Sequence, residues 1–136
     1  MAFTGLATKV YKDPVTVQWV NSIKDNFDII ITGVGKAWVN FDGTAPPVIR
    51  GSFNVASVTR AAIGVYTINF TTGFTTGGYV VAGNLYDTGS QMHIGIDRTA
   101  TDLFLTGSIG IETYNDAGTL LDSSIVCLIA FGARNP

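Results

Sequence analysis

The chain contains two patterns of apolar residues, one with the period of a helix and one with the period of a strand. Four apolar residues near the N-terminus are spaced by three, four and three positions: Val20, Ile23, Phe27 and Ile30. This spacing places them along one face of a helix. From residue 36 onward, short runs alternate apolar and polar residues between turn residues, which is typical of strands. The sequence therefore predicts a short N-terminal helix followed by an all-β part.

The predicted helix begins with Asp13 as its cap and Pro14 at its first helical position. Asp13 can accept hydrogen bonds from free backbone N–H groups, and proline suits the first helical position. The apolar face has two interpretations. It could cover one face of the β part, or three copies could pack it together in a short trimeric bundle. Two heptad-like steps are fewer than a coiled coil needs, so the pattern leaves both open. The four residues of this face are candidate trimer-interface residues.

The β part divides into short strands at its turn signals. The predicted strands are 37–41, 48–55, 65–70, 79–86, 91–96, 103–113 and 124–131. Asp42 and Gly43 form a turn dipeptide, and Gly51 is a candidate β-bulge. A single sheet would leave a large apolar face in water, which favours two packed sheets. The predicted fold is an all-β antiparallel β-sandwich of about seven to eight strands, preceded by a short N-terminal helix and trimeric.

The last predicted strand is apolar on both sides. Ile125, Cys127, Ile129 and Phe131 alternate with Val126, Leu128 and Ala130. Because one face of an antiparallel sheet usually meets solvent, this strand is expected either at the centre of a sheet or in a subunit interface. Ile129 therefore joins the candidate trimer-interface residues. Six other residues are predicted to form the core: Trp38, Phe41, Phe53, Tyr66, Ile68 and Phe70.

Length and composition set limits on the class of protein. The 136 residues are enough for one domain, which divides into an N-terminal attachment segment (1–35) and a β-sandwich domain (36–136). Hydrophobic residues make up 46% and charged residues 13%, an excess that favours an oligomer interface. The net charge is -2 and the eight Lys and Arg residues are scattered, so nucleic acid is not an expected partner. No signal peptide is expected at the N-terminus, and no apolar run approaches the length that membrane insertion needs.

Few residues indicate chemistry. His93 is the sole histidine, which excludes zinc sites built from several histidines. The single cysteine, Cys127, lies in an apolar run and is expected to be a small buried hydrophobe. Most of the later acidic residues flank predicted turns, where Asp accepts backbone hydrogen bonds. No catalytic residue, metal or cofactor is therefore expected.

Two predicted strand ends combine aromatic rings with hydrogen-bonding side chains. The residues concerned are Tyr86, Asp87, Tyr114, Asn115 and Asp116. Rings that stack and oxygens that accept hydrogen bonds are what a sugar site uses. The alternative is that each tyrosine packs its ring on the rim of the core and leaves its hydroxyl in water.

Three phrases of the chain resemble a known type of domain: Lys36–Thr44, Ile49–Val55 and Gly64–Thr71. They are similar to a small β-domain of tail-fibre and related virion proteins of tailed bacteriophages, and the resemblance covers about the middle third of the chain. It implies a non-enzymatic homotrimer in the virion, of the tail-fibre or fibre-tip type, made in the host cytoplasm. The implied partners are other tail or baseplate proteins and a bacterial surface glycan or outer-membrane receptor. The five strand-end residues are then the candidates for receptor binding.

Two alternatives stay open, the first of them because no fibre shaft is recognised in the sequence. The first is an adaptor, head-fibre, baseplate or decoration protein of the virion that never meets a receptor. The second is a glycan-degrading enzyme of the tailspike type, which would need two carboxylates facing each other across a cleft.

Overall fold

The structure, a computed structural model, describes residues 34–87, 92–97 and 104–133, and this part of the chain is all-β. Its strands are β1 (Ala37–Asp42), β2 (Val48–Phe53), β3 (Val55–Ala62), β4 (Val65–Phe70), β5 (Val80–Tyr86), β6 (Met92–Ile96), β7 (Ser108–Asn115) and β8 (Ile125–Phe131). The described residues contain no helix. The predicted helix, with Val20, Ile23, Phe27 and Ile30, lies outside the described residues.

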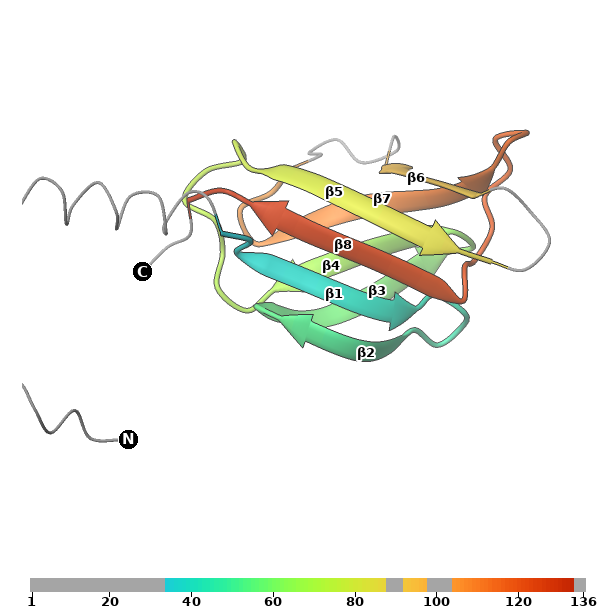
Figure 1. Cartoon of the computed structure of the whole chain (residues 1–136), viewed down its shortest axis with the longest axis horizontal. Coiled ribbons are helices and arrows are strands. Elements are labelled where there is room, and N and C mark those ends of the chain that lie inside the picture. Colours follow the sequence, from blue (N-terminus) through green and yellow to red (C-terminus); the bar gives the residue numbers. More distant parts are fainter. Residues whose placement is uncertain (1–33, 88–91, 98–103, 134–136) are drawn as a thin grey trace, which may run out of the picture.

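The strands form two antiparallel sheets of four strands each. Sheet A has the order β2-β1-β8-β5, and sheet B has the order β3-β4-β7-β6. The two sheets lie face to face, with sheet A in front in Figure 1. One core cluster contains buried side chains from both, which is the arrangement of a sandwich. The all-β prediction is confirmed.

Alternation along each strand decides which side chains enter the core. In β1, Val39 and Phe41 are buried, and in β8, Val126 and Leu128 are buried. Sheet B contributes the matching positions of β4 and β7, such as Ile68. Since successive side chains point to opposite faces, the residues between these positions must face outward.

Two of the predicted core residues are therefore misplaced. Trp38 is 42% exposed and Phe53 is 47% exposed. They are paired across β1 and β2, so both lie on the outer face of sheet A. Both side chains are large and hydrophobic, but the parity set by Val39 and Phe41 places Trp38, and with it Phe53, outside the core. The predictions for Phe41, Tyr66, Ile68 and Phe70 are confirmed.

One predicted strand, 48–55, is in fact the join of two strands. The chain crosses from sheet A to sheet B at Asn54, which has a φ of 56°. Asparagine tolerates this left-handed conformation better than most residues. Its side chain also stabilises the crossing, because the amide donates to the carbonyls of Lys36 and Thr72 and accepts from the Thr72 N–H. The register between β1 and β2 shifts beside Gly51, where a bulge was predicted.

The sandwich has two different ends, defined by the pairing of β1 with β8. Ala37 pairs with Ala130, so the described chain begins and finishes at one end, here called the terminal end. Phe41 pairs with Val126 and Tyr86 with Ile125 at the opposite end, here called the loop end. Figure 1 shows β1, β5 and β7 all pointing toward the loop end.

Aromatic rings close the terminal end of the core. Phe74 and Tyr79 stack with their centroids 4.3 Å apart, and Phe70 and Phe104 meet the Tyr79 ring edge-on. Burial raises the pKa of the Tyr79 hydroxyl to about 12. The segment before β7 thus packs on the core without extending the strand, so the predicted strand 103–113 is replaced by an isolated bridge at Phe104 and the strand Ser108–Asn115.

Candidate functional site

The outer face of sheet A is an apolar surface with side chains in register across all four strands. One row contains Phe53, Trp38, Ile129 and Ala82, and the next contains Gly51, Asn40, Cys127 and Asn84. Val80 and Phe131 form a pair at the terminal end, and Tyr86 and Ile125 form one at the loop end. None of these side chains is charged, although an outer face of an antiparallel sheet usually meets water. Charge enters this face only at its loop end, where Asp42 has the same outward parity as Trp38 and Asn40 and pairs with Arg50.

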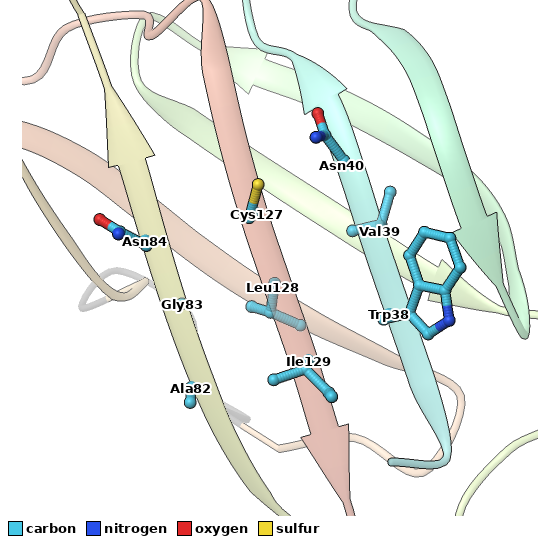
Figure 2. A pocket seen from close by; sticks show the side chains of 9 residues that line it. All are labelled: Trp38, Val39, Asn40, Ala82, Gly83, Asn84, Cys127, Leu128 and Ile129. Carbon is cyan, nitrogen blue, oxygen red and sulfur yellow. The ribbon is translucent and has the colours of Figure 1, made fainter.

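Small side chains make this face concave. Trp38, Asn40, Cys127, Ile129, Ala82 and Asn84 line a shallow hollow of about 530 Å³. Figure 2 shows the Trp38 ring standing on the β1 side of the hollow and Cys127 and Ile129 along its floor on β8. The ring lies over Gly51, where an added Cβ would come within 3.4 Å of it. The Trp38 ring thus borders the hollow on its β1 side.

Cys127 lies on this face and is partly exposed, so the prediction of a buried hydrophobe is wrong. The neighbouring Asn40 has a shielded Oδ1 for which no donor is found among the described residues. An acceptor removed from water without a donor lowers stability. The middle of the hollow therefore combines a thiol and an amide within an apolar rim.

The outer face of sheet B has the opposite character. On the half nearer the terminal end, its outward residues in β3, β4 and β7 are small and polar: Ser57, Thr59, Thr67, Asn69 and Ser108. Nearer the loop end the same parity of β7 includes Tyr114 and the buried Glu112. Asn69 donates a hydrogen bond to Ser57 across the strands at 3.0 Å. This is the surface expected of a sheet facing water. The outer face of sheet A therefore differs from that of sheet B, because it has few of the polar side chains expected on a sheet face in water.

The five predicted receptor-binding residues all lie at the loop end, but they do not share one site. Tyr86 is 59% exposed and belongs to sheet A, while Tyr114 belongs to sheet B. Asp87, Asn115 and Asp116 line neither of the two hollows described in this subsection. The five residues therefore share an end of the sandwich but not a binding site.

Three of these residues are engaged with neighbouring groups. Asn115 accepts a hydrogen bond from the Thr119 N–H through its side chain, which stabilises the turn after β7. Asp116 lies 2.6 Å from His93, and the His93 ring stacks on Tyr114 with centroids 5.6 Å apart. The sequence did not indicate the His93–Asp116 pair, because β6 and β7 become neighbours only through the fold.

A network around Asp122 fixes the loop end. The Asp122 carboxylate accepts hydrogen bonds from Arg60, from the Gly64 N–H and from the Tyr66 hydroxyl. Burial alone would raise the pKa of Asp122, but these hydrogen bonds outweigh it and hold the pKa below its usual value. For Tyr66, burial first and the Asp122 carboxylate second raise the pKa of the hydroxyl. The network joins sheet B to the segment that leads into β8.

A second hollow of about 470 Å³ opens between the edge strands β5 and β6. Apolar side chains including Val81, Ile94 and Phe104 line it. Gly83 permits this approach of the sheets, because an added Cβ would meet Ile94 at 2.8 Å. This hollow is a continuation of the core and contains no charged group that could act on a ligand.

The described residues contain no cluster of three or more His, Cys, Asp or Glu side chains suited to a metal ion. No helix within the described ranges has the length and hydropathy needed to cross a membrane. The chain matches no family model, no curated protein and no solved structure.

Proposed function

We propose that the chain is a non-enzymatic structural and binding domain of a tailed-phage virion appendage, of the tail-fibre or fibre-tip type, and that it acts as a homotrimer. The proposal rests first on the resemblance of Lys36–Thr44, Ile49–Val55 and Gly64–Thr71 to such domains. The attachment segment (1–35) would hold the domain on the particle through tail or baseplate proteins. The loop end would contact a host glycan or outer-membrane receptor.

The separation of the two ends is the observation that best supports this role. The described chain begins and finishes at the terminal end, as the pairing of Ala37 with Ala130 requires. Tyr86, Asp87 and Asp116 lie at the other end. A domain held at one end presents the other end outward, which is the geometry that host contact needs.

The test of this function is competition for adsorption. The purified full-length chain is expected to reduce phage adsorption to host cells in a dose-dependent way, since it would occupy the same receptor. Absence of competition at saturating concentration, with the protein shown to be folded, would contradict a receptor-binding role.

An adaptor or decoration role is the second candidate, and the bonding at the loop end favours it. Asn115 stabilises its own turn and Asp116 is engaged with His93, so part of the predicted binding set already has an internal role. The apolar outer face of sheet A fits a protein neighbour better than a sugar. An adaptor would bind virion particles lacking this protein and would not compete for adsorption.

A further inference from the structure

We propose that His93, Tyr114 and Asp116 form a sugar-binding subsite on the outer face of sheet B, close to the loop end. The inference rests on the proposed function and specifies the host contact as a glycan. It adds His93, which the sequence did not indicate as a binding residue. His93 pairs with Tyr114 across β6 and β7, and Asp116 follows directly after β7, which ends at Asn115.

The His93 ring is held by two neighbouring side chains. It stacks on the Tyr114 ring, with centroids 5.6 Å apart and planes 26° apart, and its Nε2 lies 2.6 Å from the Asp116 Oδ1. The Tyr114 ring in turn lies over the β6 backbone at Gly95, where an added Cβ would come within 3.2 Å of the Tyr114 Cε1. Because the imidazole is already oriented, it loses little conformational freedom when it binds a ligand.

The polar part of this arrangement is open to solvent. The His93 side chain is 49% exposed, and the Asp116 side chain is 61% exposed. Exposed ion pairs contribute little to stability, so the fold does not depend on this one. The pair therefore holds a fixed geometry at the surface, where a ligand can reach it.

The His93–Asp116 pair presents hydrogen-bond acceptors. An ionised carboxylate only accepts, so the His93 Nε2 must carry the proton that lies between the two groups. In the neutral imidazole Nδ1 is then an acceptor, and no donor to it is found among the described residues. The Asp116 carboxylate has further lone pairs beyond the one that His93 uses. Adjacent hydroxyl groups of a sugar can donate to both acceptors.

The surroundings favour a glycan over a protein as the ligand. A pyranose ring has an apolar C–H face that packs on an aromatic ring, and hydroxyl groups around its edge. Toward the terminal end, the same face of sheet B continues with the hydroxyl and amide groups of Thr67, Asn69 and Ser108, which suit further sugar units. The core of a protein interface would instead be apolar.

The test is an NMR titration of the full-length chain, because its sole histidine gives one set of imidazole signals. The probe is a preparation of soluble oligosaccharides released from the envelope of the host cells. Its control is the same preparation after periodate oxidation, which cleaves bonds between carbons that carry adjacent hydroxyl groups. We expect the imidazole signals of His93 to shift with the intact oligosaccharides and to stay unchanged with the oxidised ones.

Substitutions distinguish contact with the sugar from positioning of the ring. His93→Ala should weaken oligosaccharide binding by at least about tenfold, since it removes the stacked ring and an acceptor. Asp116→Ala should also weaken binding and change the tautomer that the imidazole nitrogen shifts report. Asp116→Asn should restore binding to within about threefold of the wild type, because its amide oxygen still accepts from the Nε2–H.

The matched control is Thr59→Ala, which removes an exposed polar side chain from the opposite edge strand of the same sheet. It should leave oligosaccharide affinity unchanged. All four variants should keep the melting temperature of the wild type, because each substituted side chain is exposed.

The contrary outcomes separate the subsite from the proposed function. If a folded His93→Ala binds the oligosaccharides and competes for adsorption as well as the wild type does, the subsite is wrong and the proposed function stands. If adsorption competition survives periodate treatment of the cells but is lost after protease treatment, the host contact is a protein and the glycan is excluded. A wild type that neither competes nor shows shifted imidazole signals would contradict the subsite and the receptor-binding role together.

Discussion

At the residue scale, Asp122 holds more of the loop end together than any candidate binding residue does. Its carboxylate joins Arg60, the Gly64 N–H and the Tyr66 hydroxyl, and Tyr66 also donates toward the Gly43 carbonyl at 2.9 Å. Gly43 has no space for a side chain, because an added Cβ would lie 2.5 Å from the Tyr66 hydroxyl. The Asp42–Gly43 turn is therefore fixed by a tertiary contact as well as by its own sequence.

Replacing Asp122 by alanine should lower the free energy of unfolding by about 1 to 3 kcal/mol, because the Gly64 N–H loses its acceptor inside the network. Chemical denaturation of the variant and the wild type measures this difference. Asp116→Ala is the control, since Asp116 has a side chain 61% exposed and exposed ion pairs contribute little. Equal losses in both variants would mean that the Asp122 network does not stabilise the fold.

The lowered pKa of Asp122 predicts a specific acid sensitivity. Its folded pKa lies below the ordinary value of 3.8, so the folded state binds this proton less readily than the unfolded state. Its stabilising contribution is complete above pH 3.8 and is lost as the pH falls through the folded pKa. Unfolding free energies measured from neutral pH to below pH 3.8 should fall less steeply in Asp122→Asn than in the wild type. The remaining slope includes Asp42, whose pKa is also lowered, chiefly by the hydrogen bond from Thr44.

Two glycines with positive φ allow the cost of backbone strain alone to be compared with the cost of strain and steric crowding together. Gly64 and Gly118 have φ values of 66° and 77°. A Cβ on Gly64 would come within 2.5 Å of the Thr113 carbonyl, whereas one on Gly118 would meet nothing within 4 Å. Gly118→Ala should therefore cost about 1 kcal/mol of strain. Gly64→Ala should cost at least about 3 kcal/mol because strain and overpacking add. Thermal melts of the two variants check this order, and equal melting temperatures would contradict it.

At the scale of elements, the strands follow from the sequence wherever one parity is apolar and the other polar. In β4, Tyr66, Ile68 and Phe70 face the core while Thr67 and Asn69 face outward, as the alternation predicts. In β1, Ala37, Val39 and Phe41 define the inward parity, but the outward Trp38 is also apolar, so its hydrophobicity predicts a core position that it does not have. The alternation of apolar and polar residues alone does not distinguish an aromatic side chain in the core from one on an exposed apolar face.

The candidate surface was less predictable than the strands because it depends on which strands are neighbours. The two sides of β8 were recognised as apolar, but only the order β2-β1-β8-β5 aligns Trp38 with Ile129 and Ala82. The division of the predicted strand 48–55 into β2 and β3 at Asn54 could not be predicted for a similar reason. An asparagine at positive φ has no unique sequence signal, and its bonds to Lys36 and Thr72 are tertiary.

The two sides of β8 should respond differently to truncation. Leu128 is 5% exposed and faces the core, so Leu128→Ala should lower the unfolding free energy by about 2 to 4 kcal/mol. Ile129 is partly exposed on the outer face, so Ile129→Ala should cost the sandwich itself about 1 kcal/mol. Denaturation at a concentration where the protein is monomeric measures both values. A larger loss for Ile129→Ala under those conditions would mean that its side of β8 is covered within a single chain.

At the scale of the whole molecule, three surfaces have three different compositions. The outer face of sheet A is largely apolar apart from its two asparagines and the Asp42–Arg50 pair, the outer face of sheet B is rich in hydroxyl and amide groups, and the loop end carries exposed aromatic and acidic side chains. In the proposed homotrimer, each of the three copies would present its own loop end. Weak sugar or receptor contacts at each loop end would then act together, which raises the apparent affinity of the trimer above that of one copy.

This arrangement makes a prediction that separates binding from assembly. Tyr86 is 59% exposed at the loop end, and its ring is available for stacking. Tyr86→Ala should reduce competition for phage adsorption by about tenfold or more if three rings act together, while the mass and melting temperature stay those of the wild type. Leu105→Ser removes an exposed apolar side chain, 47% exposed, near the terminal end and is the matched control. Tyr86 also borders the outer face of sheet A, so loss of the trimer in Tyr86→Ala would assign its ring to assembly, and unchanged competition by an intact trimer would exclude it from host contact.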